Sequence, residues 1–357
     1  MIRVILLTPA VALLALAGIY LLTPQVSLDI PPPSQRYLDT DAGFLCIGAG
    51  NSGCFVDEDL QSSYKFRMYL RTYGVTLQQL KRQGDELVAR RMNAALAGSR
   101  YVRSAIVLAH DGVVSSGEMD RSATKIYVPN EFVARMARKY PHLEYGASVH
   151  PDRADWRRRL VQARDDGAVL VKWVPAAMHI DPSDLRYVPY YRTLMELHLP
   201  LMVRLGDGGS TGEGEAALGD PRKLALPLTE GVTVIATNIA AGANYDGEPT
   251  YRRVLEMIDE YPNLYLNIAG LTRFTKVGYL TRALKAPGVK NRILYGSDWP
   301  MLFFPLTSPF YHWPDIDLAR AKTIQNIDNA WDRDVALKTA LGVPPSAFQR
   351  SSELLMR

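Results

Sequence analysis

The chain has 357 residues, of which 47% are hydrophobic and 22% are charged, and its formal net charge is +4 at pH 7. This is the composition of a globular protein with a sizeable core, and the length fits one large α/β barrel. Zinc-finger spacing and a glycine-rich phosphate loop are both missing from the sequence, so nucleic-acid binding is not expected.

The first element is an uncharged stretch from Val4 to Leu22 that follows Arg3. As a helix it would span about 28 Å, close to the hydrocarbon thickness of a bilayer. We therefore expect a transmembrane anchor in residues 1–23. A cleaved signal peptide is the competing interpretation, because Ala15-Leu16-Ala17 resembles a cleavage site. The next basic residue is Arg36, so the positive-inside rule places the rest of the chain on the periplasmic side of the membrane.

A proline-rich linker, residues 24–36, follows the anchor and leads into one domain of residues 37–357. Two cysteines, Cys46 and Cys54, lie in a glycine-rich loop near the start of this domain. In an exported protein they would form a local disulfide, but the sequence gives no geometry, so two buried thiols are an equal alternative.

From residue 101 onward, short apolar runs alternate with amphipathic segments, and an earlier run precedes residue 41. Many runs are continuous and rich in β-branched residues, which is typical of strands buried on both faces of a parallel sheet. The eight predicted strands are Tyr37–Thr40, Ser104–Ala109, Glu144–Val149, Val169–Val174, Leu201–Leu205, Val232–Ala236, Leu264–Ala269 and Arg292–Tyr295. The predicted helices are Asn130–Lys139, Ala154–Arg164, Tyr187–Leu197, Pro249–Glu260 and Thr275–Leu284, with a mostly helical tail from Asp315. Eight strands predict a TIM-type (β/α)8 barrel, whereas an open doubly wound sheet would carry a Gly-x-Gly-x-x-Gly after its first strand.

Polar side chains at the ends of these strands mark the candidate site, because such barrels do chemistry at the C-terminal strand ends. They are Asp41 and Gly43 after the first strand, Lys172 in the fourth, Arg204 ending the fifth, Asn238 after the sixth and Asp298 after the eighth. A charged group in a buried strand is costly unless it is paired. We therefore expect Lys172, Arg204 and Asp298 to meet in the barrel mouth.

Several segments resemble the amidohydrolase-related family of metal-dependent hydrolases, in the branch with a single N-terminal anchor. The resemblance covers nearly all of the chain after residue 37. It rests on Ser52–Phe55, Tyr127–Asn130, Val149–Pro151, Val171–Pro175, Gly296–Pro300 and Asp332–Lys338. It implies a barrel in which zinc or another divalent metal activates water. In this family the metal is held by His-x-His after the first strand, by histidines after the fifth and sixth, and by an aspartate after the eighth.

Most of these metal ligands are missing. The His-x-His position reads Asp41-Ala42-Gly43, and the two later histidine positions hold Arg204 and Asn238. Only Asp298 and Lys172 match the family pattern. Because a zinc site requires three or four ligands, we expect no metal and no cofactor. We predict instead that Arg204, assisted by Lys172, neutralises Asp298 and also Asp41.

Two hypotheses for the function follow. The first is a membrane-tethered amidohydrolase-like barrel that has lost metal-dependent hydrolysis and acts as a binding or structural subunit. Its partners would be the bilayer and a homologous active subunit or membrane complex. The alternative is a divergent hydrolase or lyase that acts through Lys172, Asp298 and Asp41. A sensor whose cationic mouth holds a carboxylate ligand is a third class. His110 and His150 follow the second and third strands, where we expect turn and packing roles.

Overall fold

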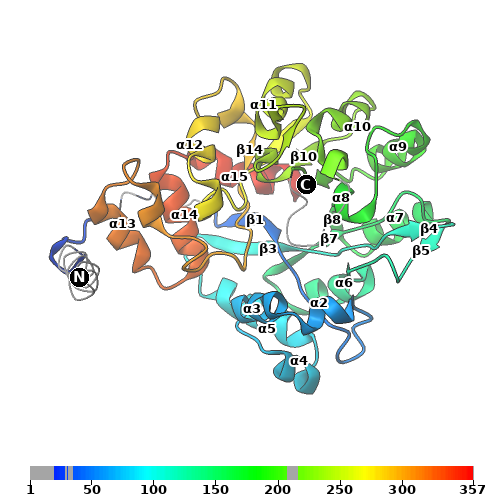
Figure 1. Cartoon of the computed structure of the whole chain (residues 1–357), viewed down its shortest axis with the longest axis horizontal. Helices are drawn as coiled ribbons and strands as arrows, with labels where there is room; N and C mark the ends of the chain where they lie inside the picture. Colours follow the sequence, from blue (N-terminus) through cyan, green and yellow to red (C-terminus); the bar gives the residue numbers. More distant parts are fainter. Residues whose placement is uncertain (1–19, 29, 31–34, 207–215, 357) are drawn as a thin grey trace, which may run out of the picture.

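The protein is built around eight parallel strands, one for each of the eight predicted runs (Figure 1). The computed structural model describes residues 20–28, 30, 35–206 and 216–356. The strands are β1 (Tyr37–Ala42), β3 (Val102–Leu108), β7 (Leu143–Ala147), β8 (Ala168–Trp173), β9 (Leu201–Val203), β10 (Val234–Ala236), β13 (Leu264–Asn267) and β14 (Ile293–Leu294). They pair in the order β1-β3-β7-β8-β9-β10-β13-β14.

Hydrogen bonds between the first and last strands close this sheet. Thr40 N donates to Tyr295 O at 3.1 Å, and Asp298 N donates to Asp41 O at 3.0 Å. The neighbouring strand pairs within the sheet are parallel as well. The TIM-type barrel is therefore confirmed, and the open doubly wound sheet is wrong.

Helices surround the barrel, and the five predicted from the sequence are present with one change. They are α6 (Asn130–Lys139), α7 (Trp156–Asp165), α9 (Val188–Glu196), α11 (Thr250–Glu260) and α12 (Tyr279–Ala283). The segment predicted as Thr275–Leu284 breaks at Gly278, which adopts φ 82°, so α12 is shorter than expected. The tail forms α13 (Leu318–Gln325), α14 (Ala330–Ala340) and α15 (Pro345–Leu355).

A group of elements that the sequence analysis did not predict lies between β1 and β3. It contains α2 (Glu58–Ser62), α3 (Tyr64–Thr72), α4 (Leu77–Gln83) and α5 (Glu86–Ala97). Two further short helices are α8 (Pro175–Met178) and α10 (Ala225–Thr229). Short strands pair as β2 (Phe55–Val56) with β6 (Ile126–Tyr127), β4 (Val114–Ser115) with β5 (Glu118–Met119), and β11 (Asn244–Tyr245) with β12 (Glu248–Pro249).

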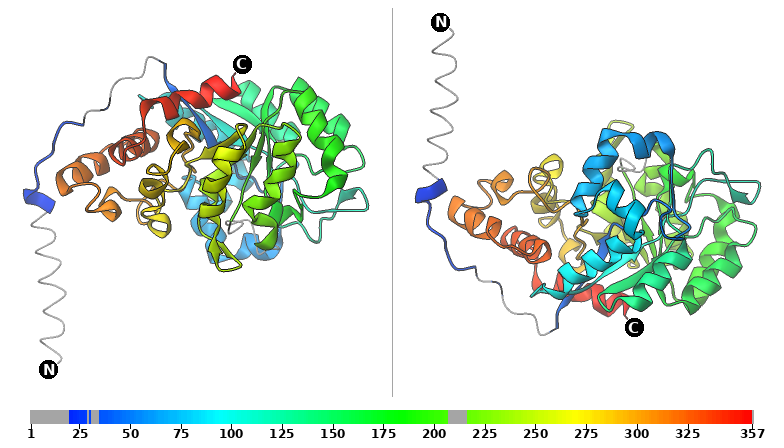
Figure 2. Two further views of the ribbon diagram at one scale, coloured as in Figure 1. Left: turned by 90° about the horizontal axis from the view of Figure 1, so that it is seen from above. Right: turned by 90° about the horizontal axis from the view of Figure 1, so that it is seen from below.

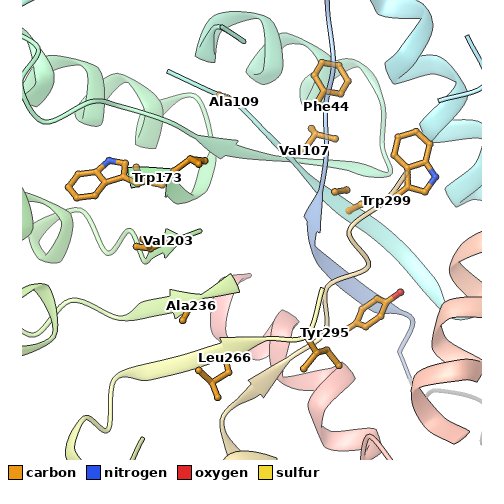
Figure 3. Close-up of a cluster of buried hydrophobic side chains, with 14 of the residues drawn as sticks. Phe44, Val107, Ala109, Trp173, Val203, Ala236, Leu266, Tyr295 and Trp299 are labelled. Carbon is orange, nitrogen blue, oxygen red and sulfur yellow. The ribbon is translucent and has the colours of Figure 1, made fainter. Parts of the chain in front are cut away.

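The core has two layers because side chains alternate along each strand. The inner cluster fills the barrel with Leu38, Ile106, Leu108, Leu170, Met202, Ile235, Leu294 and Leu355. The outer cluster lies between strands and helices, and Figure 3 shows members of it from Val107 on β3 to Leu266 on β13. Leu355 belongs to α15, which closes the N-terminal end of the barrel, whereas α2 and α3 lie over the opposite end (Figure 2).

The tail segment Asp332–Lys338, which the family resemblance includes, supports the ends of β1 and β14. Lys338 is fully buried on α14, where it donates to Gly296 O at 2.7 Å and to Asp334 at 2.6 Å. Trp331, on the same helix, donates to the buried carboxylate of Asp39 at 2.8 Å. These contacts hold the chain just before Asp298 and the neighbouring strand β1.

Cys46 and Cys54 form a disulfide, with 5.7 Å between their Cα atoms. The loop that they close is organised by the buried carboxylate of Asp85. This carboxylate accepts hydrogen bonds from Ser52 Oγ at 2.6 Å and from three backbone amides between Ile47 and Ala49. The alternative of two free thiols is wrong.

The N-terminal segment lies beside α13 (Figures 1 and 2). Lys322 of α13 donates to Tyr20 O and Thr23 O, each at 2.7 Å. The predicted anchor, Val4 to Leu22, lies outside the described residues except for its last three. Within residues 20–28, 30, 35–206 and 216–356, no helix is both long and apolar enough to cross a bilayer.

Candidate functional site

A cavity of about 420 Å³ opens at the C-terminal ends of the barrel strands. Its floor contains Asp41, Lys172, Arg204 and Asp298, which the sequence analysis placed in the barrel mouth, and Gly43 also lines it. Lys172 and Arg204 follow the interior residues Leu170 and Met202 by two positions, so the strand alternation turns both toward the barrel axis. Lys172, Arg204 and Asp298 therefore line one cavity, but no ion pair joins any two of them among the described residues.

The ion pairs at this floor differ from the predicted ones. Lys172 Nζ donates to Asp41 Oδ1 at 2.9 Å. Asp298 pairs with Arg273, in the loop after β13, and the predicted Arg204–Asp298 bridge is wrong. The reason lies in strand order, because β13 is the neighbour of β14 and β9 is not. A Cβ atom on Gly270 would lie 2.6 Å from Asp298 Oδ2, so the absence of a side chain there lets the carboxylate approach the β13 loop.

Arg204 therefore faces the cavity without a carboxylate partner among the described residues. Its Nε atom is buried and makes no hydrogen bond. The Nε of Arg273 and Oδ2 of Asp41 are likewise buried without a hydrogen-bond partner among the described residues. Buried polar groups in folded proteins are nearly always hydrogen-bonded, and leaving one unpaired costs about 1–3 kcal/mol. Three such atoms on one cavity floor indicate a site for a polar group of a ligand.

Asn238 was expected in the barrel mouth, and this placement is wrong. The side chain is buried but does not line the cavity, and its Oδ1 atom has no hydrogen-bond partner. The chain turns sharply after β10, where Asn238, Ile239 and Ala240 all have positive φ values of 49–54°. This left-handed turn moves the residue away from the position that continuation of the strand would give it.

In the resemblance drawn from the sequence, Gly43 corresponds to the second histidine of the family's His-x-His. A Cβ atom at Gly43 would lie 3.0 Å from Tyr73 Oη and 3.1 Å from Trp299 O. Tyr69 Oη forms a 3.1 Å hydrogen bond with Tyr73 Oη, and burial raises the pKa of both phenols. Two phenol groups from α3 thus stand where an imidazole would have to fit.

These observations do not fit a divalent metal. Of the family's ligand positions, only Asp41 and Asp298 offer an oxygen to the cavity, and each is paired with a cation. The guanidinium of Arg204 would repel a metal there. Elsewhere among the described residues, the one group of potential ligands at metal spacing is Cys46, Cys54 and Asp85, in which both cysteines are consumed by the disulfide.

His110 also lines the cavity, which the sequence analysis did not predict. Burial, and then the positive charge of Lys172, lowers the pKa of His110 from 6.5 to about 4, so the imidazole is neutral at pH 7. The packing role expected for His150 is confirmed, because its ring nitrogen bonds to Met178 O at 2.8 Å and the residue is buried. Arg273 and Tyr69 were missed as well, since both come from connections between strands.

The fold defines a (β/α)8-barrel protein with a charged cavity at the C-terminal end of its strands. The chain belongs to the amidohydrolase family, because the model of that family matches residues 85–341. The family expectation drawn from the sequence is thereby confirmed. A comparison with curated proteins found no match.

Solved structures with the same barrel are similar over nearly the whole chain. An uncharacterized TIM-barrel protein from Bordetella bronchiseptica has 15% identity, covers 90% of this chain and 100% of its own, and gives a TM-score of 0.51. A probable 2-pyrone-4,6-dicarboxylic acid hydrolase from Acinetobacter baumannii, with citric acid bound, has 13% identity, the same two coverages and a TM-score of 0.48. At such identities the likeness concerns the fold alone.

Proposed function

We propose that this protein binds an organic anion in the barrel mouth without a metal, and that metal-dependent hydrolysis has been lost. The observation that carries this proposal is the guanidinium of Arg204 on a charged floor, whose buried Nε has no hydrogen-bond partner among the described residues. The floor holds three cationic side chains, Lys172, Arg204 and Arg273, and two carboxylates, Asp41 and Asp298. The formal sum of these five groups is +1, which one bound anion would balance; a fourth cation of the cavity lining, Lys65, is exposed on α3.

A carboxylate is the anion that fits best. Arginine presents a planar fork of N–H donors that matches the two oxygens of a carboxylate. The cavity of about 420 Å³ lies within the range of small-molecule sites. A ligand carboxylate beside Arg204 would meet the guanidinium donor that now lacks a partner, and the barrel interior would exclude competing water.

The proposal includes the membrane tether predicted from the sequence. The support is the uncharged stretch Val4 to Leu22, with Arg3 before it and Arg36 as the next basic residue. The barrel would then be held on the periplasmic face, where it would act as a binding subunit of a membrane assembly or beside a homologous active enzyme.

Calorimetric titration of the full chain, held in amphipol, with a panel of aromatic and aliphatic monocarboxylates tests this function. We expect at least one acid to bind, and its primary amide to bind about tenfold more weakly or worse. Arg204→Gln should remove the preference for the acid. The matched control is Arg252→Gln, at an exposed arginine on the outer helix α11, and it should change nothing. Equal binding of acid and amide, or an Arg204→Gln variant that binds normally, would overturn the proposal.

A divergent hydrolase or lyase is the second candidate. Lys172, Asp41, Asp298 and the neutral imidazole of His110 share one cavity, and such groups serve acid–base catalysis without a metal. Turnover of an ester, lactone, amide or carboxylic acid that is abolished by Asp298→Asn would establish this activity. If these compounds bind but none is turned over, the anion-binding function proposed first is supported and the enzymatic one is excluded.

A further inference from the structure

The cavity is ionic at its floor and becomes largely apolar toward its opening. The ionic groups lie at the strand ends and are mostly covered, with side chains 4% exposed at Asp41 and 12% at Lys172. The walls above them are largely apolar and include Leu60 and Phe66 from α2 and α3, and Met301 from the loop after β14. A site for a small, highly polar metabolite would present polar groups along its walls as well.

Exposed apolar side chains lie at the opening or next to residues that line it, and the exposed Lys65 lines the cavity as well. Met68 lines the cavity and is nevertheless 37% exposed, and Tyr64, one helical turn earlier on α3, is 68% exposed. On the loop after β14, Phe304 is 66% exposed and stands between two residues that line the cavity, Phe303 and Pro305. Exposed apolar groups that continue an apolar cavity indicate that a ligand covers them.

From this gradient we propose that the ligand is a single-chain amphiphile, with a carboxylate head on the charged floor and an unbranched hydrocarbon tail along the apolar walls. This inference rests on the proposed function and names its ligand class. The net charge of +1 at the strand ends favours one carboxylate there, whereas the other lining cation, Lys65, is exposed on α3. The tail would remove Phe66 and Met301 from water and would cover Met68 at the opening.

Contacts on the same side of the molecule lead from the opening to the N-terminal segment. Tyr311 Oη donates to Pro305 O at 2.9 Å, beside the cavity wall. The neighbouring ring of Phe310 lies 5.9 Å from that of Tyr20. Tyr20 belongs to the end of the predicted membrane-spanning stretch, so these contacts join that end to the wall of the cavity. An amphiphile held in the membrane would meet this side of the barrel.

Binding of a series of linear carboxylates from butanoate to dodecanoate to the full chain in amphipol tests the proposal. The full-chain Arg204→Gln variant measures nonspecific partition into the carrier. After the binding to the Arg204→Gln variant is subtracted, we expect the affinity to rise by about three- to fourfold for each methylene group that the apolar walls bury. Dodecanamide should bind at least about tenfold more weakly than dodecanoate, because its head lacks the charge.

Two methionine variants separate the cavity from the remaining surface. Met68→Ser should weaken dodecanoate by about fivefold and leave butanoate unchanged. Met195→Ser is the control, because Met195 is similarly exposed at 42% but lies on α9, away from the cavity. Arg204-dependent binding of short acids with no gain from longer tails would overturn this inference and leave the proposed function intact. Failure of every carboxylate to bind would overturn both.

Discussion

The hydroxyl oxygen of Tyr73 lies 3.0 Å from the point at which a side chain on Gly43 would begin. The sequence resemblance aligns Gly43 with a metal-binding histidine. The phenol of Tyr73, the residue that caps the C-terminus of α3, fills the adjacent space, so a histidine side chain at position 43 would require α3 to move.

Gly43→His should therefore destabilise the protein without creating a zinc site. The imidazole would collide with Tyr73 and with the backbone of Trp299, and overpacking of this kind costs about 1–3 kcal/mol. Calorimetric unfolding with and without zinc measures both effects. Gly98→His is the control, because Gly98 is exposed with φ −83° and has no atom closer than 3.6 Å to an added Cβ. Zinc-dependent stabilisation of Gly43→His would contradict this interpretation.

The two arginines of the floor should differ in their effect on stability. Arg273→Met leaves the carboxylate of Asp298 without its ionic partner and should lower the free energy of unfolding by about 2–4 kcal/mol. Arg204→Met removes a cation that pairs with no carboxylate among the described residues, so stability should stay level or increase. Denaturant titration of both variants checks this order, and Asp298→Asn should restore part of the loss in Arg273→Met. If Arg204→Met lost more free energy of unfolding than Arg273→Met, the Arg204–Asp298 ion pair predicted from the sequence would be supported instead.

His110 should make stability sensitive to mild acid. The pKa of His110 is lowered to about 4 in the folded protein, against 6.5 ordinarily. As the pH falls from 6.5 toward 4, the unfolded chain takes up a proton that the folded chain does not, so the free energy of unfolding falls. The full effect is about 3 kcal/mol. Relative to His110→Gln, the wild type should lose stability over this pH range and match it above pH 7. Parallel stability curves for the two proteins would exclude the effect.

Reduction of the disulfide should loosen the loop near α2 without unfolding the barrel. The bond between Cys46 and Cys54 closes a short loop, for which chain entropy gives about 2–3 kcal/mol. The double variant Cys46→Ala/Cys54→Ala should show a lower melting temperature, and a reducing agent should lower the wild-type value to the same level. No response of the wild type to a reducing agent would mean that the disulfide adds no stability.

The strands were predictable because each is a continuous apolar run, and the barrel followed from their number. Lys172 could be expected at the cavity because it lies near the end of β8, where the alternation of side chains fixes its direction. The partner of Asp298 was not predictable. Arg273 belongs to a loop, and its approach depends on the missing side chain of Gly270 and the positive φ of Asp298.

The position of the helices that cover the barrel mouth, α2 and α3, could not be predicted from the strand pattern either. Tyr69 and Tyr73 lie one turn apart on α3, and nothing in that spacing shows that the helix folds over the barrel mouth. Asn238 was predicted to line the cavity because it follows the sixth strand, but it does not do so. Three consecutive left-handed residues turn the chain there, and no glycine or proline marks this turn in the sequence.

Metal analysis combined with chelation tests the central claim most directly. The full-length protein should contain far less than one equivalent of zinc, manganese or iron by elemental analysis after expression with these metals supplied. Its melting temperature should be unchanged by EDTA, because ion pairs of Lys172 and Arg273 neutralise the carboxylates that a metal would otherwise hold. A stoichiometric metal whose removal lowers the melting temperature by several degrees would contradict the account of a metal-free anion site.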